Sequence, residues 1–371
     1  DHMWRTLYSP VSYGDKNALI PTQLGNDKIK WESTVQKDLG LDFSFMRGRL
    51  GGTFGYYHKV TDGTLLNMTP APSSSYSTVV FNIAKIRNQG LEFDIHGDFI
   101  RKKDFRWTGS LNISRNVSKV LDINGGPFSD PNDRDALNLG TSVVKEGEPL
   151  GLLYGRVATG IIKTQEQLEA AKEAFPRWSS SSPYLNLGDI AYVYEDNSWK
   201  QDVIGHATPD FFGGYTNTIT WKRLTLTALF TFSYGNDLIY QKDVSDSGMS
   251  SLANRGTRVL NHYSEDNTSS NRPRSMWGTT YMLSSLNVYD ASYFKLKTLS
   301  LSYNLPESIC RKVRIKSASV YGTATNVFTI TSYPGPDPEV SDDPTSVIGG
   351  GRDVSTYPTV KSYTFGIRIN F

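Results

Sequence analysis

The carboxyl-terminal segment, residues 361–371, alternates strictly between apolar and polar side chains. One parity is apolar throughout and ends on an aromatic residue, with the members Tyr363, Phe365, Ile367, Ile369 and Phe371. A period of two is typical of a β-strand with one apolar and one polar face. About ten residues is also the length that a tilted strand needs to cross a bilayer. The segment therefore predicts one strand of a transmembrane β-barrel.

The same alternation recurs along the chain in segments that are joined as hairpins. The clearest segments are 34–45, 49–57, 91–99, 105–113, 212–221, 224–234, 293–303 and 315–328. A weaker hairpin spans about 141–162, with its turn at 146–149. The pattern predicts an all-β fold, a transmembrane antiparallel β-barrel to which residues 34–371 contribute about eleven strands.

One segment changes its parity partway along. Phe294 and Leu296 occupy even positions, whereas Leu299, Leu301 and Tyr303 occupy odd ones. A single extra residue in one strand shifts the pattern in this way, so we expect a β-bulge near Thr298.

The connections between the predicted strands alternate between short and long. Short ones fall at 46–48, 100–104, 146–149, 221–223 and 304–314, and long ones fall at 60–87, 118–140, 163–210, 235–290 and 329–359. Outer-membrane barrels have short periplasmic turns and longer extracellular loops. We therefore expect the long connections to be extracellular loops, and we expect the same of residues 1–33, which carry turn formers without a clean period. Within one long loop, 164–175 predicts a short helix with a capping box of Thr164 and Gln167.

An odd number of strands does not close a bacterial barrel, in which the count is even. An open sheet edge is also not tolerated in lipid. We therefore expect the remaining strands to come from sequence that precedes Asp1. No signal peptide opens the chain, so we expect either that a signal was removed or that the chain begins partway through a longer one.

Composition agrees with this hypothesis without deciding it. The chain of 371 residues is 38% hydrophobic and has a mean hydropathy of -0.40, which suits a barrel with a polar lumen as well as a soluble protein. Aromatic residues are plentiful, with 21 Tyr, 17 Phe and 7 Trp, as interfacial girdles require. A net charge of +2 gives no bias toward nucleic acid, and the single Cys310 excludes an intrachain disulfide.

Several short motifs now point to a family. They are residues 26–66, I-R-N-Q-G-L-E at 86–92, K-E-G-E-P-L-G at 145–151, P-D-F-F-G-G at 209–214, F-K-L-K at 294–297, L-S-Y-N-L-P at 301–306, T-N-V-F at 325–328 and D-P-E at 337–339. Taken together and in order, the chain resembles the carboxyl-terminal half of the barrel of SusC/RagA-type TonB-dependent transporters.

That resemblance implies a barrel of roughly 22 strands, filled by an amino-terminal plug domain that is absent from these residues. It implies import of oligosaccharides or peptides across the outer membrane of a Bacteroidetes-type bacterium. It further implies three protein partners: the remaining barrel and plug, a SusD-like surface lipoprotein, and TonB acting through the plug. One departure is Glu195-Asp196-Asn197-Ser198, where many relatives carry an Asp-Asn-Gly-Asp-Gly-like run, so the resemblance does not support a loop cation site.

Catalytic motifs are scarce. The five histidines are scattered without metal-ligand spacing, so we expect neither an enzyme nor a cofactor. Asp130, Asp133 and Asp135 have the oxygen ligands that Ca²⁺ prefers, but a solvated acidic loop is the better interpretation.

Aromatic residues in the predicted loops are the candidates for ligand contact. Such rings bury a large area and keep a polar handle, which suits the stacking of sugars and the pockets for peptide side chains. The alternative for each ring is packing between loops. The candidates are Tyr76, Phe128, Trp178, Tyr184, Trp199, Trp277 and Tyr281.

Two other functions remain open at this point. A passive porin-like channel shares the barrel and lacks the plug. A secreted, soluble, β-rich carbohydrate-binding protein shares the aromatic loops and, unlike a barrel, does not require detergent for extraction.

Overall fold

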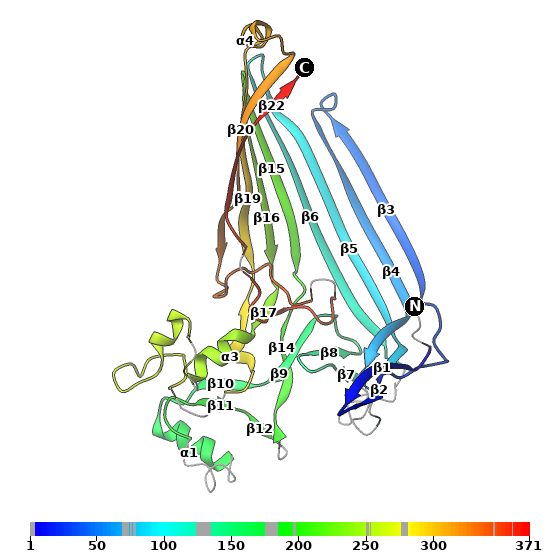
Figure 1. Cartoon of the computed structure of the whole chain (residues 1–371), viewed down its shortest axis with the longest axis vertical. Coiled ribbons are helices and arrows are strands. Elements are labelled where there is room, and N and C mark those ends of the chain that lie inside the picture. Colours follow the sequence, from blue (N-terminus) through cyan, green and yellow to red (C-terminus); the bar gives the residue numbers. More distant parts are fainter. Residues whose placement is uncertain are drawn as a thin grey trace.

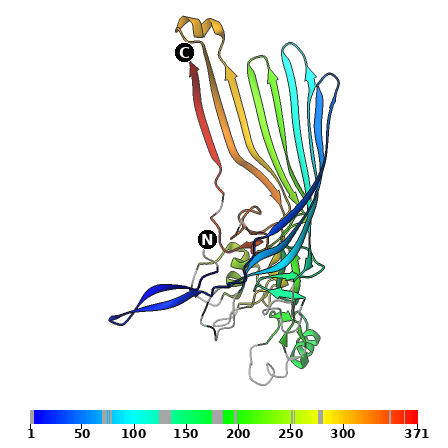
Figure 2. The same ribbon diagram turned by 90° about the vertical axis from the view of Figure 1, so that its right-hand side faces the viewer.

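A tall, curved wall of nine antiparallel strands dominates the structure (Figures 1 and 2). The computed structural model describes residues 4–68, 74, 76, 79–123, 135–174, 185–195, 198–249, 252, 254–275, 281–343, 346–357 and 359–371. Each wall strand pairs with its neighbour in the order β22-β20-β19-β16-β15-β6-β5-β4-β3. The strands are β3 (Ser33–Phe45), β4 (Leu50–Met68), β5 (Val79–Arg101), β6 (Phe105–Asp122), β15 (Phe211–Trp221), β16 (Leu224–Tyr234), β19 (Tyr293–Asn304), β20 (Ser317–Thr331) and β22 (Ser362–Asn370).

The apolar parity of each strand lies in register with that of its neighbours. One row of paired positions runs across eight strands, namely Leu41, Phe54, Phe93, Ile113, Gly213, Phe232, Phe294 and Ile330. Many side chains of this face are exposed, with Leu41 at 61% and Phe365 at 83%. Apolar surface on this scale is costly in water, so this face is suited to lipid.

The opposite face of the wall is polar. One of its rows consists almost entirely of hydroxyl side chains, namely Thr108, Thr218, Thr227, Ser300, Thr323 and Thr364. The hydroxyl oxygens of Thr218 and Thr227 lie 3.4 Å apart, and those of Ser300 and Thr323 lie 2.9 Å apart. Cross-strand hydroxyl pairs of this kind stabilise a sheet modestly and keep this face wettable.

The predicted β-bulge is confirmed. The register of β19 shifts between Leu296 and Thr298 in its pairing with β20, and β16 shows a matching shift between Leu229 and Phe230. Lys297 is the residue that the shift leaves over. Opposite it, Asn326 has a φ of 52°, a left-handed conformation that asparagine adopts more readily than most residues.

Short connections and long ones lie at opposite ends of the wall (Figure 1). The short-turn end carries residues 46–49, 102–104, 222–223 and 305–316, the last of which contains α4 (Glu307–Lys312). At the long-loop end, β4 and β5 stay paired as far as Met68 and Val79. The connection predicted at 60–87 is therefore much shorter than expected, because the hairpin continues beyond the length that a bilayer requires.

The hairpin predicted at 141–162 forms, but it is not part of the wall. β8 (Ser142–Lys145) and β9 (Leu152–Arg156) pair within a separate sheet of four strands, ordered β14-β9-β8-β7. Both parities of β8 are buried, since Val143 is 4% and Val144 is 0% exposed, so this strand offers no lipid face. The described residues thus place nine strands in the wall rather than about eleven. The loops predicted at 118–140 and 163–210 belong to one excursion between β6 and β15.

Residues 1–33 are not a simple loop as predicted. β1 (Leu7–Tyr13) and β2 (Lys16–Gln23) form an antiparallel hairpin that projects from the long-loop end (Figure 2). Gly14 in the connecting turn has a φ of 60°, where glycine meets no steric penalty. Tyr13 pairs with Lys16, so the turn consists of Gly14 and Asp15. A Gly-Asp pair between two strands is a known signal for a two-residue hairpin turn.

The remaining elements also lie at the long-loop end. They are β7 (Ala136–Asn138), β10 (Ala158–Ile161), α1 (Gln165–Ala174), β11 (Ile190–Tyr192), β12 (Tyr194–Glu195), β13 (Ser198–Trp199), β14 (Gln201–His206), β17 (Asp237–Tyr240), α3 (Gln241–Gly248), η2 (Thr257–Asn261), η3 (Ser285–Asn287), β18 (Val288–Asp290) and β21 (Arg352–Asp353).

Helix α1 is confirmed together with its capping box. The backbone N–H of Gln167 donates to Thr164 Oγ1, and the backbone N–H of Thr164 donates to Gln167 Oε1, each over 3.2 Å. In the part of the chain that is described, no helix has both the length and the apolar character needed to span a membrane.

Placing a charge on the apolar face should be far more damaging than placing it on the polar face. Phe365→Arg should destabilise the full-length protein by roughly 2–4 kcal/mol, the cost of arginine near the middle of a bilayer. Thr364→Arg, the adjacent position on the polar face, should cost much less. Urea unfolding in liposomes measures both, and equal losses would contradict the assignment of the two faces.

Candidate binding surface at the long-loop end

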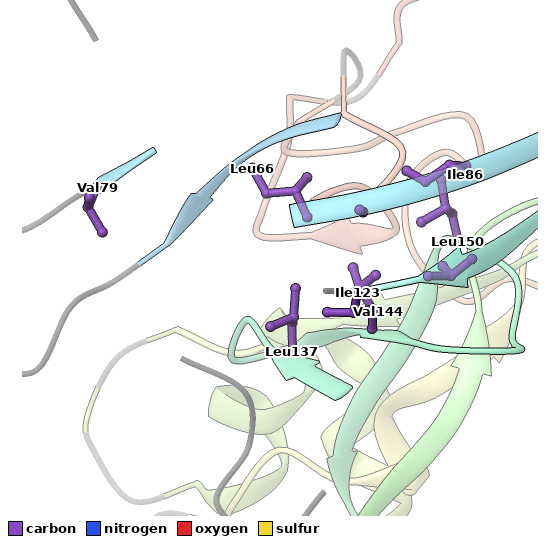
Figure 3. Close-up of a cluster of buried hydrophobic side chains, with 9 residues drawn as sticks. Leu66, Val79, Ile86, Ile123, Leu137, Val144 and Leu150 are labelled. Carbon is purple, nitrogen blue, oxygen red and sulfur yellow. The ribbon is translucent and has the colours of Figure 1, made fainter. Parts of the chain in front are cut away.

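The loops pack into a platform that is anchored to the wall by a buried apolar cluster (Figure 3). Leu66 and Ile86 come from the wall strands β4 and β5, whereas Leu137, Val144 and Leu150 come from the excursion. The backbone N–H of Leu150 also donates to the buried Ser118 Oγ over 2.9 Å. Because this cluster joins the two parts, it anchors the platform to the long-loop end of the wall strands.

Tyr281, one of the predicted ligand contacts, lies inside the platform. It is 6% exposed and packs with Ile161, Ile190 and Tyr263. Its hydroxyl donates to Asp189 Oδ1 over 3.0 Å. Burial and the nearby carboxylate raise the pKa of Tyr281 well above its ordinary value, so the hydroxyl remains a donor. In this chain Tyr281 therefore supports the loops rather than facing solvent.

The same carboxylate also binds Arg274, which belongs to the same connection as Tyr281. Arg274 Nε donates to Asp189 Oδ1 over 2.7 Å, and Arg274 Nη2 donates to Asp189 Oδ2 over 3.1 Å. This two-pronged arrangement is the strong form of an arginine–carboxylate pair. Asp189 thus joins the segments that carry Arg274 and Tyr281.

Trp199, a second predicted contact, belongs to a half-buried aromatic cluster. Its ring lies edge-on to Tyr192 and Tyr194, with centroids 5.4 and 5.8 Å away. The Tyr192 hydroxyl donates to Met282 O over 3.1 Å, and burial raises the pKa of Tyr192 to about 12. Edge-to-face packing fixes the orientation of the indole and leaves part of it accessible.

Tyr76, a third predicted contact, is half-buried, and its hydroxyl lies 3.4 Å from that of Tyr8 on β1. The structure thus places Tyr76 beside the projecting hairpin and separates it from the Trp199 cluster in sequence and in sheet. The other four candidates lie outside the described residues; they are Phe128, Trp178, Tyr184 and Trp277. Asp130 and Asp133 are likewise outside them.

A buried charge network ties the loop after β20 to the wall. Lys295 Nζ, on β19, lies 3.0 Å from Asp337 Oδ1 and 2.5 Å from Glu339 Oε2, although Lys295 is only 1% exposed. Lys297 Nζ, at the bulge, lies 3.1 Å from Glu339 Oε1. Two lysines of one strand, both opposite in parity to the apolar Phe294 and Leu296, thus bind the same carboxylate.

Hydrogen bonds determine the charge state of this network. Burial alone would raise the pKa of Asp337, but hydrogen bonds from Thr359, the Glu339 N–H and Lys295 outweigh it and lower that pKa. Burial is likewise outweighed at Glu339, chiefly by Lys295 and Lys297, so its pKa is also lowered. Both carboxyl groups are ionised at neutral pH.

A second buried carboxylate orders the loop between β16 and β19. Asp243, in α3, is 4% exposed and lies 2.7 Å from Arg272 Nη2 and 3.2 Å from Arg258 Nη1. The Tyr289 hydroxyl donates to its Oδ2 over 2.6 Å. Asp243, Asp189 and Asp337 thus have similar functions, because each binds basic and hydroxyl groups from other segments of the chain.

Sequence reasoning did not foresee these three networks. F-K-L-K at 294–297 and D-P-E at 337–339 were recognised as separate motifs, and the structure shows that each supplies one half of an ion-pair network. The period-two pattern places Lys295 within a strand. Because a lysine that is buried there requires an acidic partner, this position is the signal in the sequence for an ion pair.

The polar face of the wall has a hollow of about 370 Å³ near the short-turn end. Arg106 Nη2 donates to Asp98 Oδ1 over 2.8 Å there, next to Arg49 and His96. This hollow is polar and open to the space that the curved wall encloses. Within the described part of the chain, no group of three or more acidic, histidine or cysteine side chains has the arrangement of a metal site.

Comparisons with known proteins agree with this architecture. Residues 6–229 match the family model described as TonB dependent receptor-like, beta-barrel. The chain belongs to the TonB-dependent receptor β-barrel family. Members of this family are outer-membrane proteins, which explains the exposed apolar face of the wall.

Two curated relatives and one solved structure illustrate the similarity. TonB-dependent receptor P3 of Formosa agariphila is 32% identical over 99% of this chain and 37% of its own length. TonB-dependent receptor SusC of Bacteroides thetaiotaomicron is 26% identical over 93% of this chain and 32% of its own. A structure of the RagAB peptide transporter has the same fold, with a TM-score of 0.76 at 23% identity over 99% of this chain and 38% of that one.

The chain therefore spans only about a third to two fifths of the length of these relatives. That share agrees with a nine-stranded wall that is part of a larger barrel. The resemblance to SusC/RagA-type transporters, the partial-barrel fold and the outer-membrane location are all confirmed. A secreted soluble binding protein is excluded.

Removing one side of the buried ion pair should damage the platform severely. Lys295→Met leaves Asp337 buried without its cation, which costs roughly 3–5 kcal/mol in comparable pairs. Lys295→Met/Asp337→Leu removes both charges and should recover much of that loss. The unfolding temperature of the full-length protein in detergent measures both variants. A double variant as unstable as the single one would show that the pair is not the source of the effect.

The network should also make stability depend on pH in a specific direction. A carboxyl group whose pKa is lower in the folded state stabilises that state fully above its unfolded-state pKa, and the contribution is lost as the pH falls through the folded-state value. The ordinary pKa values are 3.8 for Asp337 and 4.5 for Glu339.

Glu339→Gln should therefore lower the unfolding temperature most above about pH 5, and the difference from the wild type should shrink toward pH 3. Thermal unfolding from pH 7 to 3 measures this difference. A difference of constant size across that range would argue against the ion pair.

Proposed function

We propose that the full-length protein imports oligosaccharides or peptides across the outer membrane as the SusC-like component of a TonB-dependent transporter. The observation that carries the proposal is the arrangement of the wall. Its outer face is apolar, its inner face is polar, and a packed loop platform lies at one end of the polar face. A ligand held by the platform is thus positioned at the entrance to a wettable passage.

The proposed mechanism is gated passage without covalent chemistry. Ligand is captured between the long loops, which we assign to the extracellular side, and a SusD-like surface lipoprotein. TonB then acts through the plug to open a path along the polar wall. Such a cycle requires that the open and closed states differ in their affinity for the ligand. The names of the relatives support transport or reception rather than catalysis.

Either ligand class suits the chemistry of the platform. Half-buried rings stack on the C–H faces of sugars or accept apolar peptide side chains, and the surrounding carboxylates and amides bind hydroxyl or backbone groups. One solved relative is described as a peptide transporter, and another relative is named SusC. Trp199 with Tyr192 and Tyr194 is the proposed contact among the described residues. Tyr76, near the projecting hairpin, is a separate proposed contact, and the four rings outside the described residues stay proposed contacts as well.

Uptake by cells tests the whole proposal. Cells that make the full-length protein and its lipoprotein should accumulate labelled oligosaccharides or labelled peptides only when TonB is present. Supplying the labelled oligosaccharides and the labelled peptides in separate experiments identifies the ligand class. Uptake that persists without TonB would instead identify a passive porin-like channel.

The Trp199 ring should contribute measurably to ligand affinity. An aromatic contact worth about 0.5–1.5 kcal/mol corresponds to a loss of roughly 2- to 12-fold in Trp199→Ala. Trp199→Phe should retain part of the affinity because it keeps a stacking face. Tyr363→Ala, which truncates an aromatic side chain of the outer apolar face, is the matched control and should bind normally. Binding to the purified transporter measures all three, and full affinity in Trp199→Ala would remove this ring from the site.

A further inference from the structure

The outer, apolar face of the wall has a groove near the short-turn end. Its volume is about 370 Å³, which lies within the range of small-molecule sites. Four adjacent strands, β6, β15, β16 and β19, contribute its apolar lining, which consists of Phe105, Ile219, Trp221, Leu224, Leu226 and Leu301. The lining residues are cross-strand partners, since Phe105 pairs with Trp221 and Leu226 pairs with Leu301. The groove is thus built into the sheet.

Basic side chains lie at the rim of this groove. The turn between β15 and β16 consists of Lys222 and Arg223, flanked by the lining residues Trp221 and Leu224. Lys222 Nζ lies 5.6 Å from the centroid of the Trp221 ring, a cation–π contact. Arg223 Nη1 donates to Leu305 O over 2.9 Å, which holds the guanidinium beside the end of β19.

The neighbouring turn adds to the positive charge. The Lys222 N–H donates to Asp104 O over 2.7 Å, so residues 102–104 lie next to the β15–β16 turn. Lys102 and Lys103 in that turn are exposed, as is the opposing acid Asp104.

Positive charge predominates over the whole short-turn end. Residues 46–49, 102–104, 222–223 and 305–316 together contain ten lysines and arginines but two acidic residues, a formal charge of +8, whereas the complete chain carries +2. The rest of the chain is therefore net negative. This end of the wall is electrostatically complementary to an anionic membrane surface.

We propose that the groove is a binding site for an anionic phospholipid of the adjacent leaflet. An acyl chain lies in the apolar groove, and the lipid phosphate and anionic headgroup contact Lys222 and Arg223. Long basic side chains at a membrane boundary reach the headgroups while their stems and neighbouring rings stay in the apolar layer. The occupant is a membrane lipid because the groove opens on the face that contacts the bilayer.

The lipid site rests on the outer-membrane location and on the geometry of the wall. It does not depend on which ligand the transporter carries, because the groove and the loop platform are on different faces and at opposite ends.

Lipid retention by the purified full-length transporter tests the proposal. The protein is mixed in detergent with equal amounts of phosphatidylglycerol and phosphatidylcholine that have identical acyl chains, and bound lipids are counted by native mass spectrometry. The wild type should retain several-fold more phosphatidylglycerol. Lys222→Gln/Arg223→Gln should lose that excess and bind the two lipids about equally.

A matched control separates this site from general attraction to a basic surface. Arg47→Gln/Lys316→Gln removes the same two types of charge from exposed positions at the same end but beside other strands, and it should keep the excess of phosphatidylglycerol. Equal retention of the two lipids by the wild type would overturn the proposal. So would an equal loss in the two double variants.

A second variant acts on the groove itself. Leu226→Trp fills part of the groove and leaves every charge in place, so it should lower the amount of phosphatidylglycerol that is retained. Leu226→Trp tests the lipid site even if Lys222→Gln/Arg223→Gln fails to insert into the membrane. Retention at the wild-type level in Leu226→Trp would also overturn the proposal.

Discussion

Every peptide group within the hydrocarbon layer must find its hydrogen-bond partner in the protein, because lipid offers none. The nine-stranded meander satisfies this for its seven inner strands through pairing on both sides. Within the described residues β3 and β22 form the two edges, and each has a partner on one side only. Since an open edge is not stable in lipid, strands outside this chain must complete the barrel. The share of the relatives that the chain spans agrees with this requirement.

Buried ion pairs organise the loops at one end of the wall. Outside the hydrocarbon layer, three buried carboxylates organise the platform, namely Asp189, Asp243 and Asp337. Asp337 acts on the wall directly through Lys295, and Lys297, at the β-bulge, pairs with the nearby Glu339. An irregularity in a strand thus becomes the point at which a long loop is joined to the barrel. The loop end is held by ion pairs and apolar clusters, whereas the turn end presents its charge to the membrane.

The parts of the fold with a strict local period were predictable from sequence. The wall strands, the bulge near Thr298 and the capping box of Thr164 all follow from short-range patterns, and the structure confirms them. The hairpin at 141–162 was misplaced because alternation and loop length do not reveal that both parities are buried, as they are at Val143 and Val144. The ion pairs of these networks join residues 15 to 85 positions apart, and no local pattern records such contacts. The aromatic candidates were only partly informative, since composition does not separate an internal ring such as Tyr281 from an accessible one.

The most direct test of the two-faced wall is an accessibility scan of β16. Single cysteines at consecutive positions from Leu224 to Tyr234, in full-length protein with Cys310 replaced by serine, are exposed to a water-soluble thiol reagent in intact membranes. We expect alternation, with protection at Leu226, Ala228, Phe230 and Phe232 and reaction at the positions between them wherever water fills the barrel. Protection or reaction of both parities alike along the strand, with no alternation, would contradict a wall that divides lipid from a wet interior.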